Sequence, residues 1–232
     1  KKNLKTITDD KEYSGSTINE IIVEKINPYL GKSLEELKIK LGITYSKGQN
    51  GYLVKKILGL DKKEESFEMK ASNIKIKTID LASSRKEQMS FPQINFVEMA
   101  KEKTFHDSEF FELVTPTFLF VIFDKDSNGN QILKNAITYK LNETDLLEVE
   151  KIWRHTVDKI KSGIYDEFIL YETDRPIDKK RQRNPIGHIR PKDAKVKATG
   201  KYRPVLTPQG LNHSIKRQCL WLNRDFIDSI IN

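Results

Sequence analysis

Two lysines in the stretch 73–80, which reads NIKIKTID, are the first residues whose type and spacing suggest chemistry. Polar and apolar residues alternate there, a pattern typical of a β-strand with one buried face. Ile74 and Ile76 then lie on one face, and Lys75 and Lys77 lie side by side on the other. Two neighbouring ammonium groups repel a metal ion and attract a phosphate. The alternative is that both lysines are solvated on the open face of a strand.

A second concentration of positive charge lies in residues 175–203. This segment has eleven Lys and Arg but two Asp, a net charge of +9, which leaves −1 for the rest of a chain whose net charge is +8. A basic excess confined to one segment predicts a positive patch, and the ordinary partner of such a patch is a polyphosphate. A solvated basic loop is the alternative. Tyr202 is the one aromatic residue in the segment, which favours duplex backbone contact over single-strand binding.

Composition indicates a globular protein, with 37% hydrophobic and 32% charged residues. No apolar run approaches membrane-spanning length and no signal-peptide core opens the chain, so we expect a cytoplasmic protein without a membrane partner. The length fits a single domain over residues 1–232, with residues 1–14 frayed or serving as a linker. Because the chain begins Lys-Lys-Asn, we expect a fragment of a longer polypeptide or a processed chain.

Hydrophobic periodicity predicts helices first, followed by a mixed sheet with helices on it. The expected helices span residues 17–29, 33–42, 48–60, 142–163 and 215–231. The expected strands span residues 73–80, 117–123, 132–139 and 168–171, and residues 188–191 are expected to be extended. The sequence has no glycine-rich phosphate loop and no Cys/His spacing typical of a metal site.

Four stretches follow one another in a fixed order: Lys47-Gly48 with GYLVKKILG at 51–59, IKIKTI at 74–79, IRPKDAK at 189–195, and Gly210 through the C-terminal helix. Together they resemble the MutH-like, GATC-specific DNA endonucleases, from about Ser33 to the C-terminus. The resemblance implies an α/β (α+β mixed), restriction-endonuclease-like fold with a mixed β-sheet core flanked by helices. It also implies that the chain is the C-terminal part of a longer type II restriction enzyme, a hydrolase of a restriction system.

In such nucleases, carboxylates hold Mg²⁺ against the scissile phosphate and a lysine orients or deprotonates the attacking water. Matched to this sequence, the family's helix Glu falls on Lys55 and its first acidic residue on Glu68. The Glu and Lys of its Glu-x-Lys motif fall on Lys75 and Lys77. The resemblance therefore implies a degenerate site with no catalytic residue and no metal, while Mg²⁺ belongs to the catalytic half of the parent enzyme.

The family recognises GATC through an Arg-Pro-Lys loop, which here is Arg190, Pro191 and Lys192. Arg190 is expected to contact guanine, because arginine is shaped for a bidentate contact in the major groove. A tyrosine that the family uses for recognition falls on Asn212, a departure that could change the specificity. The other expected DNA-binding residues, which would hold phosphates or lie beside Asn212, are Lys47, Lys192, Lys195, Lys197, His213 and Lys216.

Three functions remain open from the sequence. The first, which we expect, is a GATC-binding effector domain that acts on the catalytic N-terminal half of the same chain and could dimerise on double-stranded DNA. The second is an active Mg²⁺-dependent GATC endonuclease that recruits Asp61, Glu64, Glu65 or Asp80 around Glu68. The third is a general basic nucleic-acid-binding domain, for instance for RNA.

Overall fold

A computed structural model describes residues 3–9, 15–44, 49–82, 87–165, 168, 184–192 and 202–231. The chain divides into two compact units. The first unit comprises Lys1–Ser84 and Pro116–Lys140, and the second comprises Arg85–Thr115 and Leu141–Asn232. A single DNA-binding domain over residues 1–232 stays a prediction.

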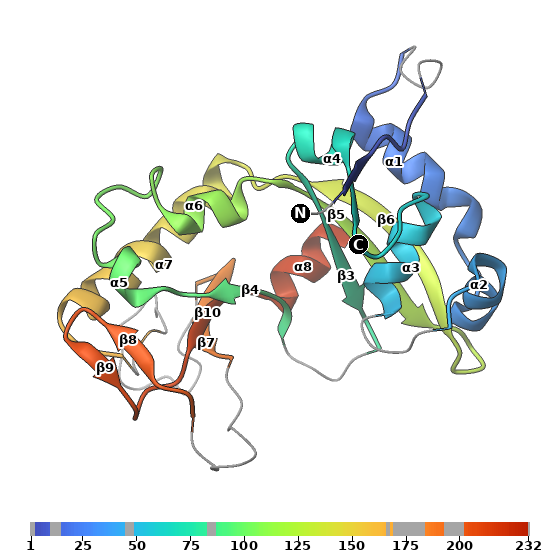
Figure 1. The fold of residues 1–232 in the computed structure, drawn as a ribbon. Coiled ribbons are helices and arrows are strands. Elements are labelled where there is room, and N and C mark those ends of the chain that lie inside the picture. Colours follow the sequence, from blue (N-terminus) through green and yellow to red (C-terminus); the bar gives the residue numbers. More distant parts are fainter. Residues whose placement is uncertain are drawn as a thin grey trace. The chain divides into compact units, whose positions relative to one another are not determined.

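The first unit is built on a three-stranded mixed sheet of β3 (Ile74–Asp80), β5 (Thr117–Lys125) and β6 (Gln131–Tyr139) (Figure 1). β3 runs parallel to β5, and β6 runs antiparallel to β5. The turn between β5 and β6 is closed by Asp126, whose carboxylate accepts hydrogen bonds from the backbone N–H groups of Asn128 and Asn130. The strand expected at 73–80 and the hairpin expected at 117–139 are both confirmed.

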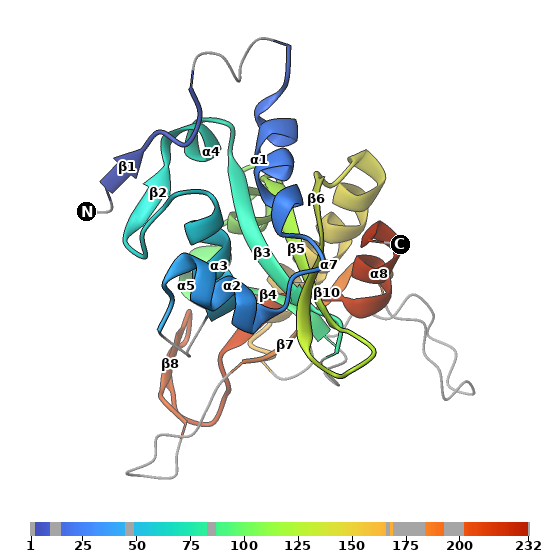
Figure 2. The ribbon, with the colours of Figure 1, turned by 90° about the vertical axis from the view of Figure 1, so that its right-hand side faces the viewer.

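Three helices cover one face of this sheet: α1 (Ile18–Ile26), α2 (Leu34–Leu41) and α3 (Gln49–Ile57) (Figure 2). Thr17 and Ser33 cap α1 and α2 with reciprocal capping boxes, and α2 ends at Gly42 in the left-handed conformation, φ 64°. The buried faces of these helices pack on the sheet residues Leu119 and Val121 to form the core. The expected helices are confirmed, with a short 3₁₀ turn, η1 (Asn27–Tyr29), after α1.

The N-terminal segment forms structure where the sequence indicated a frayed end or a linker. β1 (Asn3–Lys5) pairs in parallel with β2 (Glu64–Ser66), which leads directly into the short helix α4 (Phe67–Ala71). The Nζ of Lys5 donates to the carbonyl oxygen of Gly59 at 2.7 Å. Local sequence could not indicate this pairing, because the partner strand lies about sixty residues away.

The second unit contains a three-stranded antiparallel sheet in the order β4 (Glu87–Gln93), β10 (Gln218–Asn223), β7 (Gly187–Pro191). A hairpin of β8 (Val205–Thr207) and β9 (Gly210–Asn212) accompanies it. The helices of this unit are α5 (Phe96–Met99), α6 (Glu109–Val114), α7 (Glu143–Lys161) and α8 (Arg224–Ile231).

Helix α7 is the longest described helix and matches its prediction. Asn142 and Asp145 form a capping box at its N-terminus. Val149, Ile152 and Val157 are buried along one face, and the chain leaves the helix through Gly163, which has φ 74°. The strand expected at 168–171 lies outside the described residues, except for Phe168.

The C-terminal segment differs from the single helix expected over residues 215–231. Residues 218–223 form β10, and the helix α8 begins only at Arg224. Cys219 and Leu220 point to opposite faces of β10 and are both buried, so buried and exposed side chains do not alternate along this strand. A short apolar run of this kind has no periodicity that separates strand from helix, and the tertiary pairing decides.

Gly187 marks the close approach of β7 to β10. A Cβ atom at Gly187 would lie 2.5 Å from the backbone oxygen of Trp221. Since that oxygen belongs to a paired central strand, it cannot move away easily. We expect Gly187→Ala to lower the free energy of unfolding by about 1–3 kcal/mol, measured by denaturant unfolding.

Gly51 in α3 supplies the control, because a Cβ there meets nothing within 4 Å. Gly51→Ala is expected to raise the free energy of unfolding by about 0.5–1 kcal/mol, since alanine favours a helix interior. Equal changes in the free energy of unfolding for Gly187→Ala and Gly51→Ala would contradict the close approach of β7 to β10.

The arrangement as a whole is a mixed α+β fold with sheets flanked by helices, as expected for a restriction-endonuclease-like chain. Among the described residues, no helix is both long and apolar enough to cross a membrane.

Candidate functional site

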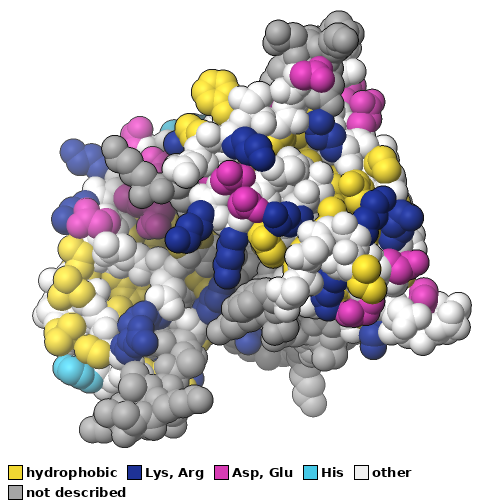
Figure 3. Space-filling model, turned by 45° about the vertical axis from the view of Figure 1, so that its right-hand side comes forward, with side chains coloured by type: hydrophobic (Ala, Val, Ile, Leu, Met, Phe, Trp, Pro, Cys, Tyr) yellow, Lys and Arg dark blue, Asp and Glu magenta, His cyan; other side chains and the backbone are white. Residues whose placement is uncertain are grey.

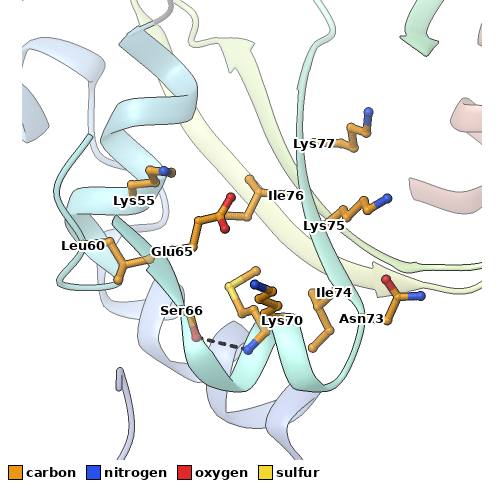
Figure 4. Close-up of a pocket in the computed structure, with 11 residues that line it drawn as sticks. Lys55, Leu60, Glu65, Ser66, Lys70, Asn73, Ile74, Lys75, Ile76 and Lys77 are labelled. Atoms are coloured by element: carbon orange, nitrogen blue, oxygen red, sulfur yellow. Dashed lines mark hydrogen bonds between the residues drawn. The ribbon is translucent and has the colours of Figure 1, made fainter. Parts of the chain in front are cut away.

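A pocket of about 450 Å³ in the first unit brings together three of the residues matched to the nuclease site. Lys55, Lys75 and Lys77 all line it, together with Glu65 and Lys70 (Figure 4). Its remaining lining includes apolar side chains of β3 and the segment before it. The sequence therefore located a real cavity, although the roles of the individual side chains differ from those expected.

Lys75 and Lys77 point to the same side of β3, and Ile76 points to the other side, toward Glu65 (Figure 4). The strand register explains this arrangement, because Lys75 pairs with Phe118 and Ile76 with Leu119 of β5. Leu119 belongs to the core beneath the helices, so the lysines occupy the opposite face of the sheet. The alternation read from NIKIKTID is confirmed.

Lys55 makes hydrogen bonds that the sequence did not indicate. Its Nζ donates to the backbone oxygen of Glu64 at 2.6 Å and to that of Lys62 at 3.1 Å. The ammonium group thus ties helix α3 to the segment that enters β2. Of the four lysines that line the pocket, Lys70 and Lys75 are exposed, and Lys55 and Lys77 are partly buried.

Glu68 does not line the pocket with the three lysines. Its side chain is 4% exposed, and Oε1 accepts hydrogen bonds from the backbone N–H of Ile7 (2.9 Å), the backbone N–H of Thr8 (3.1 Å) and the hydroxyl of Thr8 (2.9 Å). Oε2 accepts from the hydroxyl of Ser66 at 2.7 Å. The carboxylate matched to a metal ligand therefore holds the N-terminal segment against α4.

The electrostatics of Glu68 fit this role. Burial raises the pKa of Glu68, but the hydrogen bonds from its own backbone, Ser66, Thr8 and Ile7 lower it more, so that the net pKa is lowered. The carboxylate is ionised in the folded chain at neutral pH, with its lone pairs occupied by protein donors. A divalent cation would have to displace these donors, so Glu68 does not fit a metal site.

The other acids considered for catalysis are engaged separately. Asp61 pairs with Lys56, and that hydrogen bond lowers the pKa of Asp61. Glu64 accepts from the backbone N–H of Asp61 at 2.8 Å, and Asp80 accepts from the backbone N–H of Ala82 at 3.1 Å. Within the ranges that the structure describes, no three His, Cys, Asp or Glu residues form a group that could hold a metal ion.

In the second unit, Arg190 and Pro191 end strand β7, and Lys192 follows them. The Arg190 Cζ lies 5.5 Å and the Lys192 Nζ 5.6 Å from the centre of the Trp221 ring on β10. Both distances are within the range of a cation–π interaction. The structure thus brings together the two charged residues of the Arg-Pro-Lys loop on one aromatic side chain.

Lys192 is held by contacts from its neighbours as well. Its backbone N–H donates to the oxygen of Arg217 at 3.0 Å, and its backbone oxygen accepts from Nε2 of Gln93 at 3.0 Å. Its Nζ donates to the hydroxyl of Ser90 on β4. Arg217 in turn donates to Oε1 of Gln93 at 3.1 Å. The end of β7 is therefore connected to both other strands of the sheet.

Trp221 is the residue of this surface that sequence reasoning missed, because it falls within the helix expected over residues 215–231. Its side chain is half-buried, at the point where β10 pairs with Ser90 of β4 and His188 of β7. The apolar run 219–222 has no alternation that could have placed Trp221 on one face of a strand.

Asn212, which stands where the family has a tyrosine, lies at the end of β9. Its Oδ1 accepts hydrogen bonds from the backbone N–H groups of Ser214 (2.8 Å) and Ile215 (3.3 Å), so the amide oxygen caps the turn that follows. His213 is exposed in this turn. The Nζ of Lys216 lies 5.2 Å from the centre of the Tyr202 ring.

Lys47, Lys195 and Lys197 lie outside the described residues, as does most of the basic segment 175–203. On the face drawn in Figure 3, the described Lys and Arg side chains stand among Asp and Glu side chains instead of forming one unbroken block. Cys219 is fully buried, and burial raises the pKa of its thiol.

Comparison with known proteins places these observations in context. No known family model matches the chain. The chain is 26% identical over 259 residues to the type II restriction enzyme Sau3AI of Staphylococcus aureus. The match takes in 95% of this chain and 52% of the relative, so the chain spans about half the length of the curated relative. Over nearly its whole length, the chain is therefore homologous to part of a type II restriction enzyme.

Proposed function

We propose that this chain is a MutH-like domain that binds double-stranded DNA at GATC and does not cut it. The observation that carries the proposal is the pocket of the first unit, where Lys55 and Lys75 stand at positions that nucleases of this type use for metal-binding carboxylates. Glu68, the remaining matched carboxylate, is committed to the N-terminal segment by four hydrogen bonds.

Electrostatics supports a silent site. A unit positive charge ~4 Å from a divalent cation, at an effective dielectric constant of ~20, is unfavourable by about 8 kcal/mol. An ammonium group facing solvent, as that of Lys75 does, is instead suited to a backbone phosphate. The pocket then holds DNA without the metal that hydrolysis would require.

The sheet of the second unit supports sequence recognition. Arg190 lies at the end of β7 beside Lys192, and the guanidinium group can form two parallel hydrogen bonds with a guanine edge in the major groove. Lys192 and Lys216 are suited to phosphate contacts. Similarity to a restriction enzyme makes double-stranded DNA the expected partner.

Within a longer enzyme, this domain would be the C-terminal half and would act as an effector. Binding of one GATC site here would activate the Mg²⁺-dependent N-terminal half on another site, or would bring two chains together on DNA.

The test of the proposal uses the chain with a labelled duplex that contains one GATC site, with and without Mg²⁺. Binding and cleavage are scored in the same tubes at fixed salt, because electrostatic affinity depends on salt concentration. We expect binding that prefers GATC, needs no metal and leaves the duplex intact. Mg²⁺-dependent cleavage would overturn the silent site, and tighter binding to RNA or single strands would overturn duplex recognition.

An active nuclease is the second candidate, and the position of Glu65 in the lining of the pocket favours it. If the chain cuts GATC duplexes, Glu65→Ala should abolish cleavage and leave binding unchanged. Cleavage that survives this substitution would exclude the pocket as its source.

Lys75 provides a separate prediction about phosphate contact. Lys75→Ala is expected to weaken binding to all duplexes alike and to reduce the slope of log affinity against log salt by about 1. The matched control is Lys101, an exposed lysine of the other unit whose Nζ lies 2.9 Å from Oε1 of Glu98 on α5. Titrations at several salt concentrations should leave the slope of Lys101→Ala at the wild-type value. A sequence-selective loss in Lys75→Ala would be inconsistent with a phosphate contact.

A further inference from the structure

We infer that Trp221 is a specificity-determining positioning residue, which orients Arg190 and Lys192 for reading DNA. This inference rests on the proposed function, because it assigns a role within the same recognition surface. Trp221 itself does not have to touch a base. It acts through the two cations that lie on its ring.

The indole ring is a common platform for both charged side chains. The Arg190 Cζ lies 5.5 Å and the Lys192 Nζ 5.6 Å from the ring centre. A positive charge within about 6 Å of an aromatic ring centre is attracted by the ring's quadrupole, and tryptophan is the strongest of the aromatic side chains in this respect. The two cations are thereby held near each other, although their charges repel.

The platform has a fixed position because β10 is the central strand of its sheet. Trp221 pairs with His188 of β7 and with Ser90 of β4. Next to Trp221, Leu220 and Leu222 are fully buried and anchor the strand in the core. The ring is therefore presented by the central, paired strand of the sheet.

Lys192 is restrained by other contacts in addition to the ring. Lys192 donates from Nζ to Ser90 and is tied through its backbone to Gln93 and Arg217. Arg190 pairs with Cys219 of β10, and Pro191 separates it from Lys192 along the chain. Removal of the ring should therefore change the position of the Lys192 ammonium group little.

A restrained arginine serves recognition more than bulk affinity. The guanidinium fork must meet a guanine edge in one orientation, whereas a phosphate accepts many orientations of a cation. Ordering the side chain before binding reduces the conformational entropy that binding has to remove. Loss of Trp221 should therefore lower discrimination between sequences while general DNA affinity changes little.

The experiment compares Trp221→Leu and Trp221→Phe with the wild-type chain. The probes are a duplex with one GATC site and the same duplex with one base pair of the GATC site changed. For Trp221→Leu we expect the ratio of the two affinities to fall about tenfold, the size of a lost cation–π interaction. Trp221→Phe keeps a ring and should lose about threefold. Affinity for the changed duplex should remain within about twofold of wild type.

Trp153 is the matched control, since it is the other tryptophan and lies on α7 of the same unit, with its Nε1 donating to Glu102 at 2.6 Å. Trp153→Phe is expected to reduce stability and to leave the ratio of affinities unchanged. If Trp221 had only a structural role, Trp221→Phe and Trp153→Phe would have the same effect on the ratio of the two affinities.

A double-mutant cycle with Arg190→Ala separates positioning from general damage. If Trp221 acts through Arg190, the substitution at Trp221 should cause no further loss of discrimination once Arg190 is removed. Should Trp221→Leu not fold, the same cycle with Trp221→Phe gives the answer. Additive losses would overturn the inference. A wild-type chain that binds both duplexes equally would instead overturn the proposed function itself, so the two failures can be told apart.

Discussion

Replacing Arg190 with Ala is expected to lower the affinity for a GATC duplex by about 1–3 kcal/mol and to relax the preference for that sequence. The guanidinium group offers a planar pair of donors that matches the two acceptors of guanine in the major groove. Alanine leaves those acceptors without a protein partner. Competition binding with the GATC duplex and a one-base variant measures both the affinity and the preference.

Lys192→Ala is the matched substitution, since Lys192 lies on the same tryptophan and is exposed. Its ammonium group is expected to contact phosphate, so the loss should be similar for every duplex. Equal losses on every sequence in both variants would refute this division of labour between Arg190 and Lys192.

Glu68→Ala is expected to lower the free energy of unfolding by about 3 kcal/mol or more, since hydrogen bonds to a charged group contribute about 1.5–3 kcal/mol each. The donors of Ile7, Thr8 and Ser66 would lose their acceptor inside the protein. Denaturant unfolding measures the change. Proteolysis near the N-terminus should accelerate in parallel, because β1 loses the anchor that follows it.

Glu68→Gln provides the control and tests the charge. The amide oxygen can still accept from Ile7 and Thr8, so Gln should retain more stability than Ala. The lowered pKa of Glu68 means that its contribution is present above the ordinary pKa of a glutamate, about 4.3, and is lost as pH falls through the lower pKa of the folded chain. The wild type should therefore lose more stability than Glu68→Gln on acidification below about pH 4.5. If the free energy of unfolding of the wild type and of Glu68→Gln changed in parallel with pH, this would contradict an ionised, hydrogen-bonded carboxylate at Glu68.

Local signals in the sequence were sufficient for several elements of the fold. The capping residues Thr17, Ser33 and Asn142 mark helix starts because each side chain satisfies backbone N–H groups of its own first turn. The alternation at 74–80 marks a strand because successive side chains point to opposite faces. These signals depend on neighbours along the chain, and the structure confirms them.

Elements whose stability depends on distant partners could not be predicted in this way. β1 forms because Glu64–Ser66 pairs with it, and β10 is a strand because β4 and β7 lie on its two sides. The sequence of either segment is compatible with another structure when read alone. Pairing between distant segments decides the conformation, because the backbone N–H and C=O groups of a strand find their hydrogen-bond partners on a neighbouring strand.

For the candidate site, the sequence by itself determined which positions carry charge: the lysines at 55, 75 and 77, and the Arg-Pro-Lys stretch at 190–192. Only the tertiary structure decided what those charges do. It engaged Lys55 with backbone oxygens, turned Glu68 toward Ile7 and Thr8, and placed Trp221 beneath Arg190. The physical reason is that the type of a side chain sets its charge and donors, whereas the partners of those donors come from parts of the chain that meet only after folding.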